Sequence, residues 1–281
     1  MSGEVKVVRP GPLATVQDLG RPGHAHLGVP HSGAADPGSL RLANRLVGNA
    51  EDAAGLELTF GGAALRFHAP AWIAVTGAPL PVRPGGMNAP CHVPAGGVVE
   101  FGTPFGGVRT YVAVRGGLDV PAVLGSRSTD LLSGLGPAPL AAGDRLAVGR
   151  ASGPITVDVA PGYEPEDEPV LRIIPGPRDD WFESLEPLVR GTYEVSSHSN
   201  RIGVRLEGPP LARRREGELP SEGMVTGALQ VPPNGLPIIF LADHPTTGGY
   251  PVAAVVTTAD LSRAGQLRPG QRVRFRFAAR S

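Results

Sequence analysis

The sequence is poor in residues that several kinds of enzyme site require. Cys91 is the only cysteine among 281 residues, which excludes an internal disulfide and a four-cysteine zinc site and favours a reducing cytoplasm. Lys6 is the only lysine among 26 basic residues. A phosphate-binding loop, an internal Schiff base and a resident biotinylated lysine all need this side chain, so we expect none of them.

Long apolar runs and familiar catalytic signatures are also missing. The N-terminal segment has no apolar core of signal-peptide length, and no later run approaches the ~20 apolar residues of a membrane span, so we expect a cytoplasmic protein without a membrane partner. The 26 basic and 26 acidic residues balance, which argues against a nucleic-acid partner. No Gly-x-Ser-x-Gly elbow or dinucleotide fingerprint occurs, so a serine triad and nicotinamide or flavin chemistry are disfavoured.

Glycine and proline are abundant, with 40 and 31 copies. They recur between short apolar runs such as 71–76, 98–101 and 237–241, which is typical of many short strands separated by turns. Apolar and polar residues alternate in 202–206 and 272–277, which predicts strands with one buried face. We therefore expect a mainly β fold with a few short helices.

The clearest helix signal begins at Asp36, a good N-cap, and is followed by Pro37 at the first helical position. Apolar residues then follow at helical spacing up to Gly48, and we expect this helix to cover a barrel end. Shorter helical candidates are 120–124, 178–185 and 259–264.

A polar, acidic, proline-bearing stretch at 161–169 is the best linker candidate. It predicts an N-terminal β domain over 1–165 and a C-terminal β domain over 166–281. The boundary is approximate, because exchange of strands between the halves would shift it.

The segment 243–250 follows the apolar, strand-like run 236–242 with an acid, two threonines and two glycines. Hydroxyls and unhindered backbone N–H groups can bind a compact polar or anionic ligand. A glycine turn between two strands is the alternative interpretation. Asp243 is the best candidate for a general base or a water-positioning group, because the strand delivers it beside Thr246 and Thr247.

The segment 125–129 places three hydroxyls around the guanidinium of Arg127, which suits carboxylate or phosphate oxygens. The alternative is a polar loop whose serines bond to local backbone. Asn200 and Arg201 stand at the entry of the alternating strand, and we expect Arg201 to pair with Asp243. A turn with an exposed ion pair is equally consistent with these two residues.

The remaining candidates are weaker. His31 and Ser32 lie in a loop before the first helix, where an imidazole can act as acid, base or donor. His24 and His26 are the only close histidine pair and stand in a glycine loop, so we expect no metal site. Asp18 is expected to fix a loop, and Asp36 to cap a helix.

Several ordered motifs together carry a family resemblance. They are 15–23, 28–36, 114–121, 125–129, 199–208, 227–232 and 243–250. In this order and spacing, from about Val5 to Phe277, the chain resembles the carboxyltransferase-like family that includes the C subunit of bacterial 5-oxoprolinase (KipA-like) and allophanate hydrolase subunit 2, the urea amidolyase-related protein. The resemblance implies two cyclophilin-like β-barrel domains.

One position departs from the family pattern. The family usually has aspartate, a variable residue and glutamine before Thr-Thr-Gly-Gly-Tyr, whereas this chain has Asp243, His244 and Pro245. Proline cannot replace the donor and acceptor of a glutamine amide, so a change in substrate or weaker catalysis is expected if that glutamine contacts substrate.

The resemblance implies that this chain is one subunit of an ATP-dependent 5-oxoprolinase. This enzyme is a hetero-oligomer that opens 5-oxo-L-proline to L-glutamate. Its partners would be a KipI-like protein of the B type and a protein of the A type, with ATP and Mg²⁺ acting at the level of the complex. The expected catalytic residues are Asp243, Arg127, Thr246 and Thr247. The expected substrate-binding residues are Ser126, Ser128, Thr129, Asn200, Arg201, Gly248, Gly249, Tyr250, His31 and Ser32.

Two other functions stay open at this point. One is a biotin-dependent carboxyltransferase subunit that acts on urea or a related small amide, with the biotin on a carrier protein. The other is a KipA-like regulatory protein that binds a kinase inhibitor. The catalytic hypothesis requires the loops near residues 127 and 246 to line one pocket.

Overall fold

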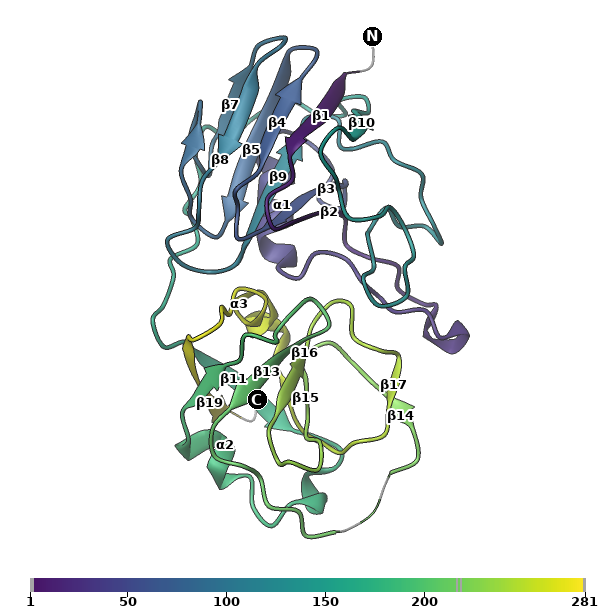
Figure 1. Ribbon diagram of the computed structural model, residues 1–281, viewed down its shortest axis with the longest axis vertical. Coiled ribbons are helices and arrows are strands. Elements are labelled where there is room, and N and C mark those ends of the chain that lie inside the picture. Colours follow the sequence, from purple (N-terminus) through teal and green to yellow (C-terminus); the bar gives the residue numbers. More distant parts are fainter. Residues whose placement is uncertain (1–2, 216, 218, 280–281) are drawn as a thin grey trace. The chain divides into compact units, whose positions relative to one another are not determined.

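The computed structural model describes residues 3–215, 217 and 219–279 and shows a mainly β chain with a few short helices (Figure 1). The chain divides into two compact units. The first comprises Met1–Arg21, Ser32–Asp130 and Gly134–Pro165, and the second comprises Pro22–His31, Leu131–Ser133 and Glu166–Ser281. In the described part of the chain, no helix has the length and apolar character needed to cross a membrane.

The first unit is built from two five-stranded antiparallel sheets. One sheet has the order β10 (Arg145–Ala147), β1 (Glu4–Arg9), β4 (Ala64–Phe67), β8 (Val98–Phe101), β6 (Val82–Arg83). The other has the order β2 (Leu13–Gln17), β3 (Gly55–Thr59), β9 (Arg109–Val114), β5 (Ala71–Gly77), β7 (Pro90–Val93). Side chains from both sheets form one apolar core, so each sheet has an inner face and an outer face.

The second unit contains a closed seven-stranded barrel. Its strand order is β11 (Val170–Pro175), β18 (Val252–Val256), β15 (Ala228–Gln230), β16 (Ile238–Phe240), β13 (Gly203–Glu207), β12 (Tyr193–Val195), β19 (Arg272–Phe277). A separate ribbon pairs β14 (Glu222–Gly223) with β17 (Thr247–Gly248). The two alternating strands predicted from the sequence are confirmed as β13 and β19, and the arginines of β19 lie on its exposed face.

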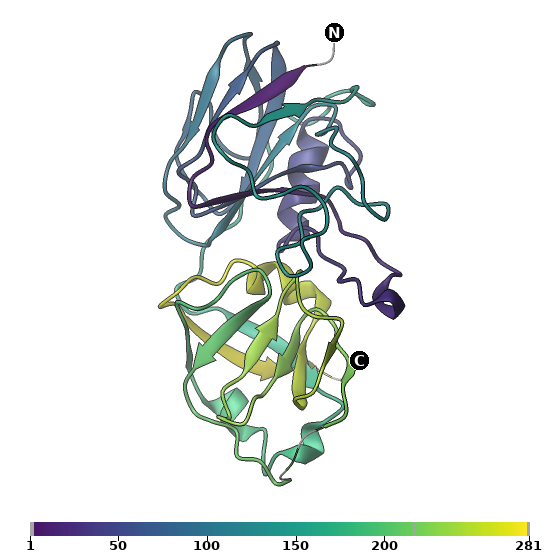
Figure 2. The ribbon, with the colours of Figure 1, turned by 45° about the vertical axis from the view of Figure 1, so that its right-hand side comes forward.

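The predicted first helix is confirmed as α1 (Pro37–Leu46). The Asp36 carboxylate accepts a hydrogen bond from Ser39 N at 3.0 Å and caps its first turn. Ala43 packs with Ala74 of β5 and Ala113 of β9, whose strand neighbours point into the core. The helix therefore covers the outer face of a sheet and not a barrel end (Figure 2). The two small alanines leave room for it.

The other helical predictions hold only in part. No helix occupies 120–124, where a bridge joins Val123 to Ser126. The candidate at 178–185 contains only the 3-10 turn η2 (Asp179–Trp181), and α2 (Glu186–Arg190) follows it. The last candidate forms η3 (Thr258–Asp260) and the short α3 (Leu261–Ala264). The turn η1 (Ala25–Leu27) was not predicted.

A buried carboxylate fixes β11 in the second unit. Asp260 is 1% exposed and accepts hydrogen bonds from Arg172 N, Nε and Nη2 at 2.7, 2.9 and 2.8 Å. Burial alone would raise the pKa of Asp260, but the hydrogen bonds from Arg172 and the charges of Arg172 and Arg263 outweigh it and lower the pKa to about 2.

This lowered pKa predicts an acid-dependent loss of stability. The ionised Asp260 stabilises the fold above the ordinary pKa of 3.8, and this contribution disappears as the pH falls toward 2. Asp260→Asn should lower the free energy of unfolding at pH 7 by about 1–3 kcal/mol and flatten its decline below about pH 4. Urea denaturation at several pH values measures both effects. Glu186→Gln, in an exposed helical pair, is the control, and an equal decline in wild type and Asp260→Asn would contradict the assignment.

Candidate functional site

The outer face of the β2-β3-β9-β5-β7 sheet carries a buried polar group of side chains, here called the sheet-face cluster. Its members are Thr15, Gln17, Glu57, Arg109 and Tyr111, and each is at most 3% exposed. The strand register places Thr15 opposite Glu57, and Glu57 opposite Tyr111. Because side chains of directly paired residues share a face, these polar groups lie together beside α1.

Glu57 and Tyr111 form the centre of the sheet-face cluster. The Tyr111 hydroxyl donates to Glu57 Oε2 at 2.7 Å and accepts from Asp36 N at 2.8 Å. Ala35 N also donates to Glu57 Oε2, and Arg109 Nε lies 3.4 Å from Glu57 Oε1. Burial, followed by the charges of Glu57 and Asp36, raises the pKa of Tyr111 well above its ordinary value. The tyrosine is therefore a neutral donor at neutral pH.

The predicted serine-arginine segment is organised by Asp18. Ser126 Oγ and Ser128 Oγ donate to Asp18 Oδ1 at 2.6 and 2.5 Å, and Arg127 N donates to Asp18 Oδ2 at 2.6 Å. Ser126 Oγ also accepts from Ser128 N at 3.0 Å. The expected role of Asp18 in fixing a loop is confirmed. Both hydroxyl protons bind the carboxylate of Asp18, which is distant in sequence, and the local backbone contact that the alternative interpretation expected is limited to the bond from Ser128 N to Ser126 Oγ.

The guanidinium of Arg127 is directed toward residues 119–120. Its Nε donates to Val120 O at 2.8 Å, and its Nη2 lies 3.1 Å from the exposed Asp119 carboxylate. The guanidinium that contacts the serine segment belongs to Arg21, whose Nη2 donates to Ser128 O at 2.5 Å. A catalytic role for Arg127 stays a prediction.

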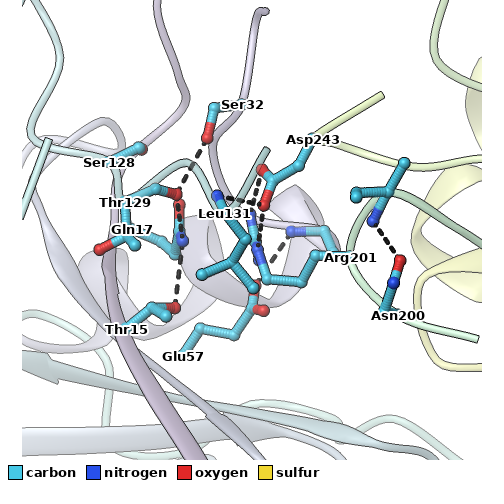
Figure 3. A network of polar contacts seen from close by, with 12 residues as sticks. Thr15, Gln17, Ser32, Glu57, Ser128, Thr129, Leu131, Asn200, Arg201 and Asp243 are labelled. Atoms are coloured by element: carbon cyan, nitrogen blue, oxygen red, sulfur yellow. Dashed lines mark hydrogen bonds and ion pairs between the residues drawn. The ribbon is translucent and has the colours of Figure 1, made fainter. Parts of the chain in front are cut away.

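Ser32 and Thr129, two other predicted residues of the first unit, are joined by a hydrogen bond at the Thr129 carbonyl. Ser32 Oγ and Gln17 Nε2 both donate to Thr129 O at 3.0 Å, and Gln17 Nε2 also donates to Thr15 Oγ1 at 3.0 Å (Figure 3). These contacts connect the Ser32 loop and the 126–130 segment to the sheet-face cluster.

In the second unit, Arg201 and Asp243 form a buried bidentate ion pair (Figure 3). Arg201 Nε lies 2.9 Å from Asp243 Oδ2, and Arg201 Nη2 lies 3.0 Å from Asp243 Oδ1. Leu131 N donates to Asp243 Oδ2 at 3.1 Å. The side chains are 1% and 0% exposed, so the predicted pairing is confirmed in a buried form. Both carboxylate oxygens accept hydrogen bonds here, and a general-base role for Asp243 stays a prediction.

The Asn200 side chain shapes the turn into β13. Its Oδ1 accepts from Ile202 N at 2.8 Å and from Gly203 N at 3.3 Å (Figure 3). An asparagine bonded to the backbone two residues on is a common turn geometry, as the alternative interpretation anticipated. His31, also in the second unit, is exposed.

The predicted threonine-glycine segment forms a strand and a turn. Thr246 and Gly249 are partly buried, and Thr247 and Tyr250 are exposed. A Cβ atom at Gly248 would lie 2.5 Å from Gln230 Nε2, so a larger residue there would displace the Gln230 side chain. Thr247 is an exposed residue of β17, where it pairs with Gly223 of β14.

The departure at His244 and Pro245 also has a clear structure. The His244 ring is 5% exposed and stacks on Phe240, with ring centroids 5.8 Å apart and planes inclined by 15°. Its Nδ1 lies 2.8 Å from Pro245 O. The imidazole is thus held between an aromatic ring and the backbone.

The predicted site residues fall in both units. Ser32 and 126–129 belong to the first, whereas His31, Asn200, Arg201, Asp243 and 246–250 belong to the second. A common pocket for the loops near residues 127 and 246 stays a prediction. Within the described residues, no group of three or more His, Cys, Asp and Glu side chains is arranged to hold a metal ion.

Sequence reasoning did not single out Gln17, Arg21, Glu57, Arg109 or Tyr111 as site residues. Gln17 and Arg21 stand within the quoted motif 15–23, and Glu57 is a lone acid inside the apolar strand β3. Glu57 alternates with Leu56 and Leu58, whose side chains enter the core, so the local pattern places it on the outer face and gives no signal of its burial.

Comparison with known proteins identifies the family to which this chain belongs. The carboxyltransferase domain family, subdomains A and B, matches residues 27–277. This chain belongs to that family. The C subunit of the Escherichia coli 5-oxoprolinase is 39% identical over 96% of this chain and 90% of its own length. The urea amidolyase of Lachancea kluyveri is 36% identical over 96% of this chain, which corresponds to 17% of that protein.

Solved structures agree with this assignment. The crystal structure of the K. lactis urea amidolyase has a TM-score of 0.91 and 32% identity over 98% of this chain and 19% of that one. Another solved relative has a TM-score of 0.90, and the chain spans 56% of its length. The similar proteins named here are enzymes or enzyme subunits, and this chain corresponds to nearly all of the 5-oxoprolinase C subunit but to a small part of a urea amidolyase.

The buried ion pair predicts a large asymmetry between two arginines. Arg201→Met leaves the buried Asp243 carboxylate without two donors and should lower the free energy of unfolding by about 3–5 kcal/mol. Arg127→Met breaks an exposed pair with Asp119 and should cost less than about 1 kcal/mol. Urea denaturation of both variants measures the difference, and similar small losses would show that the Arg201 pair is not structural.

The Tyr111 hydroxyl predicts alkaline sensitivity. Because its folded pKa is raised, the neutral hydroxyl stabilises the fold below about pH 10, and this contribution is lost as the pH rises through the folded pKa. Tyr111→Phe should cost about 1–3 kcal/mol at pH 7 and show a shallower decline above about pH 10 than wild type. Chemical denaturation from pH 7 to pH 11 checks this, with the exposed Tyr250→Phe as control. Parallel curves for wild type and Tyr111→Phe would refute it.

Proposed function

We propose that this chain is the C subunit of an ATP-dependent 5-oxoprolinase, a complex that opens 5-oxo-L-proline to L-glutamate. The observation that carries the proposal is the 39% identity to the E. coli C subunit, which extends over 96% of this chain and 90% of that protein. A match over nearly the full length of both chains favours the same role more strongly than a match to one part of a larger enzyme.

The side chains present have the chemical types that this reaction needs. An unstrained lactam is a poor electrophile, and its opening requires donors for the negative charge that develops on the carbonyl oxygen. In our proposal, the Thr247 hydroxyl and the Arg201 guanidinium supply such donors, and Asp243 holds Arg201 in a fixed plane. These are roles in orienting and stabilising the substrate.

ATP and Mg²⁺ belong to the proposal only at the level of the complex. ATP would supply a phosphoryl group that makes the lactam carbonyl susceptible to attack by water. The N-terminus of α1 does not fit a nucleotide phosphate, because the Asp36 carboxylate already accepts from Ser39 N and Ser39 Oγ there. We therefore assign no step of nucleotide chemistry to residues of this chain.

The proposed assembly contains a KipI-like protein of the B type and a protein of the A type. We place it in the cytoplasm, in keeping with the single cysteine Cys91. The chain alone should leave 5-oxoproline intact.

Reconstitution tests the proposed reaction. The three-subunit mixture with Mg-ATP should release glutamate from 5-oxo-L-proline, measured by amino-acid analysis, and omission of any subunit should abolish it. Thr247→Val removes an exposed hydroxyl without changing side-chain volume and should lower kcat by about 10-fold or more. Thr192→Val, at another threonine outside the proposed site, is the matched control. No glutamate from a folded, assembled wild-type mixture would overturn the proposal.

A second candidate is a carboxyltransferase subunit that transfers a carboxyl group from carboxybiotin on a carrier to a small amide. The TM-score of 0.91 to the K. lactis urea amidolyase favours it. Product formation that depends on a biotinylated carrier and bicarbonate, with urea as acceptor, would support this candidate. Glutamate formation from 5-oxoproline without carrier or bicarbonate would exclude it.

A further inference from the structure

Among the buried side-chain atoms of the first unit that have no hydrogen-bond partner within the described residues, three belong to residues that meet near residues 128–129. They are Gln17 Oε1, Arg21 Nη1 and Thr129 Oγ1. Their residues are 0%, 1% and 1% exposed. Buried polar atoms in folded proteins are nearly always hydrogen-bonded, so three such atoms in one place point to a missing binding partner.

The three atoms are gathered around residues 128–129. Arg21 Nη2 donates to Ser128 O at 2.5 Å, and Gln17 Nε2 donates to Thr129 O at 3.0 Å. Both planar side chains are therefore anchored at one end to consecutive carbonyl groups, and each leaves its other polar end unused. The Thr129 hydroxyl belongs to the same short segment as these two carbonyl groups.

The charge of Arg21 limits what that molecule can be. Its Nε and Nη2 donate to the neutral carbonyls of Val123 and Ser128, and no carboxylate in the described part of the chain lies within ion-pair distance of it. The neighbouring Asp18 carboxylate is already bound by the 126–128 segment. A buried guanidinium with only neutral acceptors is costly, and an anionic ligand would offset this cost.

We propose that Arg21, Gln17 and Thr129 form a subsite for the α-carboxylate and the adjacent N–H of a lactam amino acid. Arg21 Nη1 donates to the carboxylate, Gln17 Oε1 accepts from the lactam N–H, and the Thr129 hydroxyl donates to the second carboxylate oxygen. In 5-oxoproline these two groups are attached to the same carbon atom, so they present an acceptor and a donor side by side. This inference rests on the proposed 5-oxoprolinase function.

Arg21 is then a specificity-determining residue. Urea and simple lactams are neutral and lack the carboxylate, so they gain nothing from the guanidinium. The subsite favours 5-oxoproline over neutral amides.

Access to the subsite requires motion, because the three atoms have no surface exposed to solvent. Gly136 lies over the segment, and a Cβ atom there would come within 2.0 Å of Ser128 O and 3.2 Å of Arg21 Nη2. The ligand enters only when the covering chain moves.

The test compares two ligands that differ only in the carboxylate, 5-oxo-L-proline and 2-pyrrolidinone. Isothermal titration of the full chain, alone and in the reconstituted complex, should show at least ~10-fold tighter binding of 5-oxoproline. Arg21→Met should reduce 5-oxoproline binding to the level of 2-pyrrolidinone and leave the latter unchanged. Gln17→Met should weaken both ligands. Arg45→Gln, at an exposed arginine paired with Glu51, should change neither.

The outcomes separate this proposal from the function on which it rests. Equal affinities in wild type, or no binding of either ligand to chain or complex, would show that the cluster holds only internal water and would overturn the subsite. Glutamate formation with an unchanged KM in Arg21→Met would overturn it while leaving the 5-oxoprolinase function intact. If Arg21→Met does not fold, Arg21→Lys keeps the charge and should retain the preference for 5-oxoproline.

Discussion

The first unit depends on keeping charged and hydroxyl side chains satisfied on a sheet face that water does not reach. Glu57 lies in β3, between β2 and β9, and its carboxylate is held by the Tyr111 hydroxyl, by Ala35 N and by Arg109. Tyr111 and Arg109 come from β9 and Ala35 comes from the loop before α1, so this loop, the strand β9 and the carboxylate must all be in place together. An apolar face would pack without such conditions.

The second unit also buries charged side chains that must satisfy one another, but in a single ion pair. Asp243 and Arg201 are fully buried and satisfy one another through two parallel hydrogen bonds. A buried pair of this kind adds little net stability, but it fixes the plane of the guanidinium. In both units, buried charged and hydroxyl side chains are thus held on or beside β strands: Glu57 and Tyr111 in the first unit, and Arg201 and Asp243 in the second.

Local signals in the sequence predicted the parts of the structure that local chemistry decides. The Asp36 cap, the proline after it and the apolar spacing placed α1 correctly, and alternation located β13 and β19. The pairing of Arg201 with Asp243 followed from complementary charge at two strand ends. The position of α1 on a sheet face was missed, because it depends on the small Ala74 and Ala113 of distant strands. Likewise, the central place of Glu57 depends on strand register, and the orientation of Arg127 toward Asp119 depends on the path of the loop that joins them; no local pattern reveals either.

The way in which the barrel of the second unit closes has a consequence for its biogenesis. Its first strand, β11, runs parallel to its last strand, β19, and Leu171 pairs with Phe275 about a hundred residues later. During translation the edge of β11 stays open until the ribosome has released β19, and an open strand edge invites pairing with other nascent chains. Slow synthesis through this region should therefore increase the need for chaperones, even though the finished barrel leaves neither of these two strands at an edge.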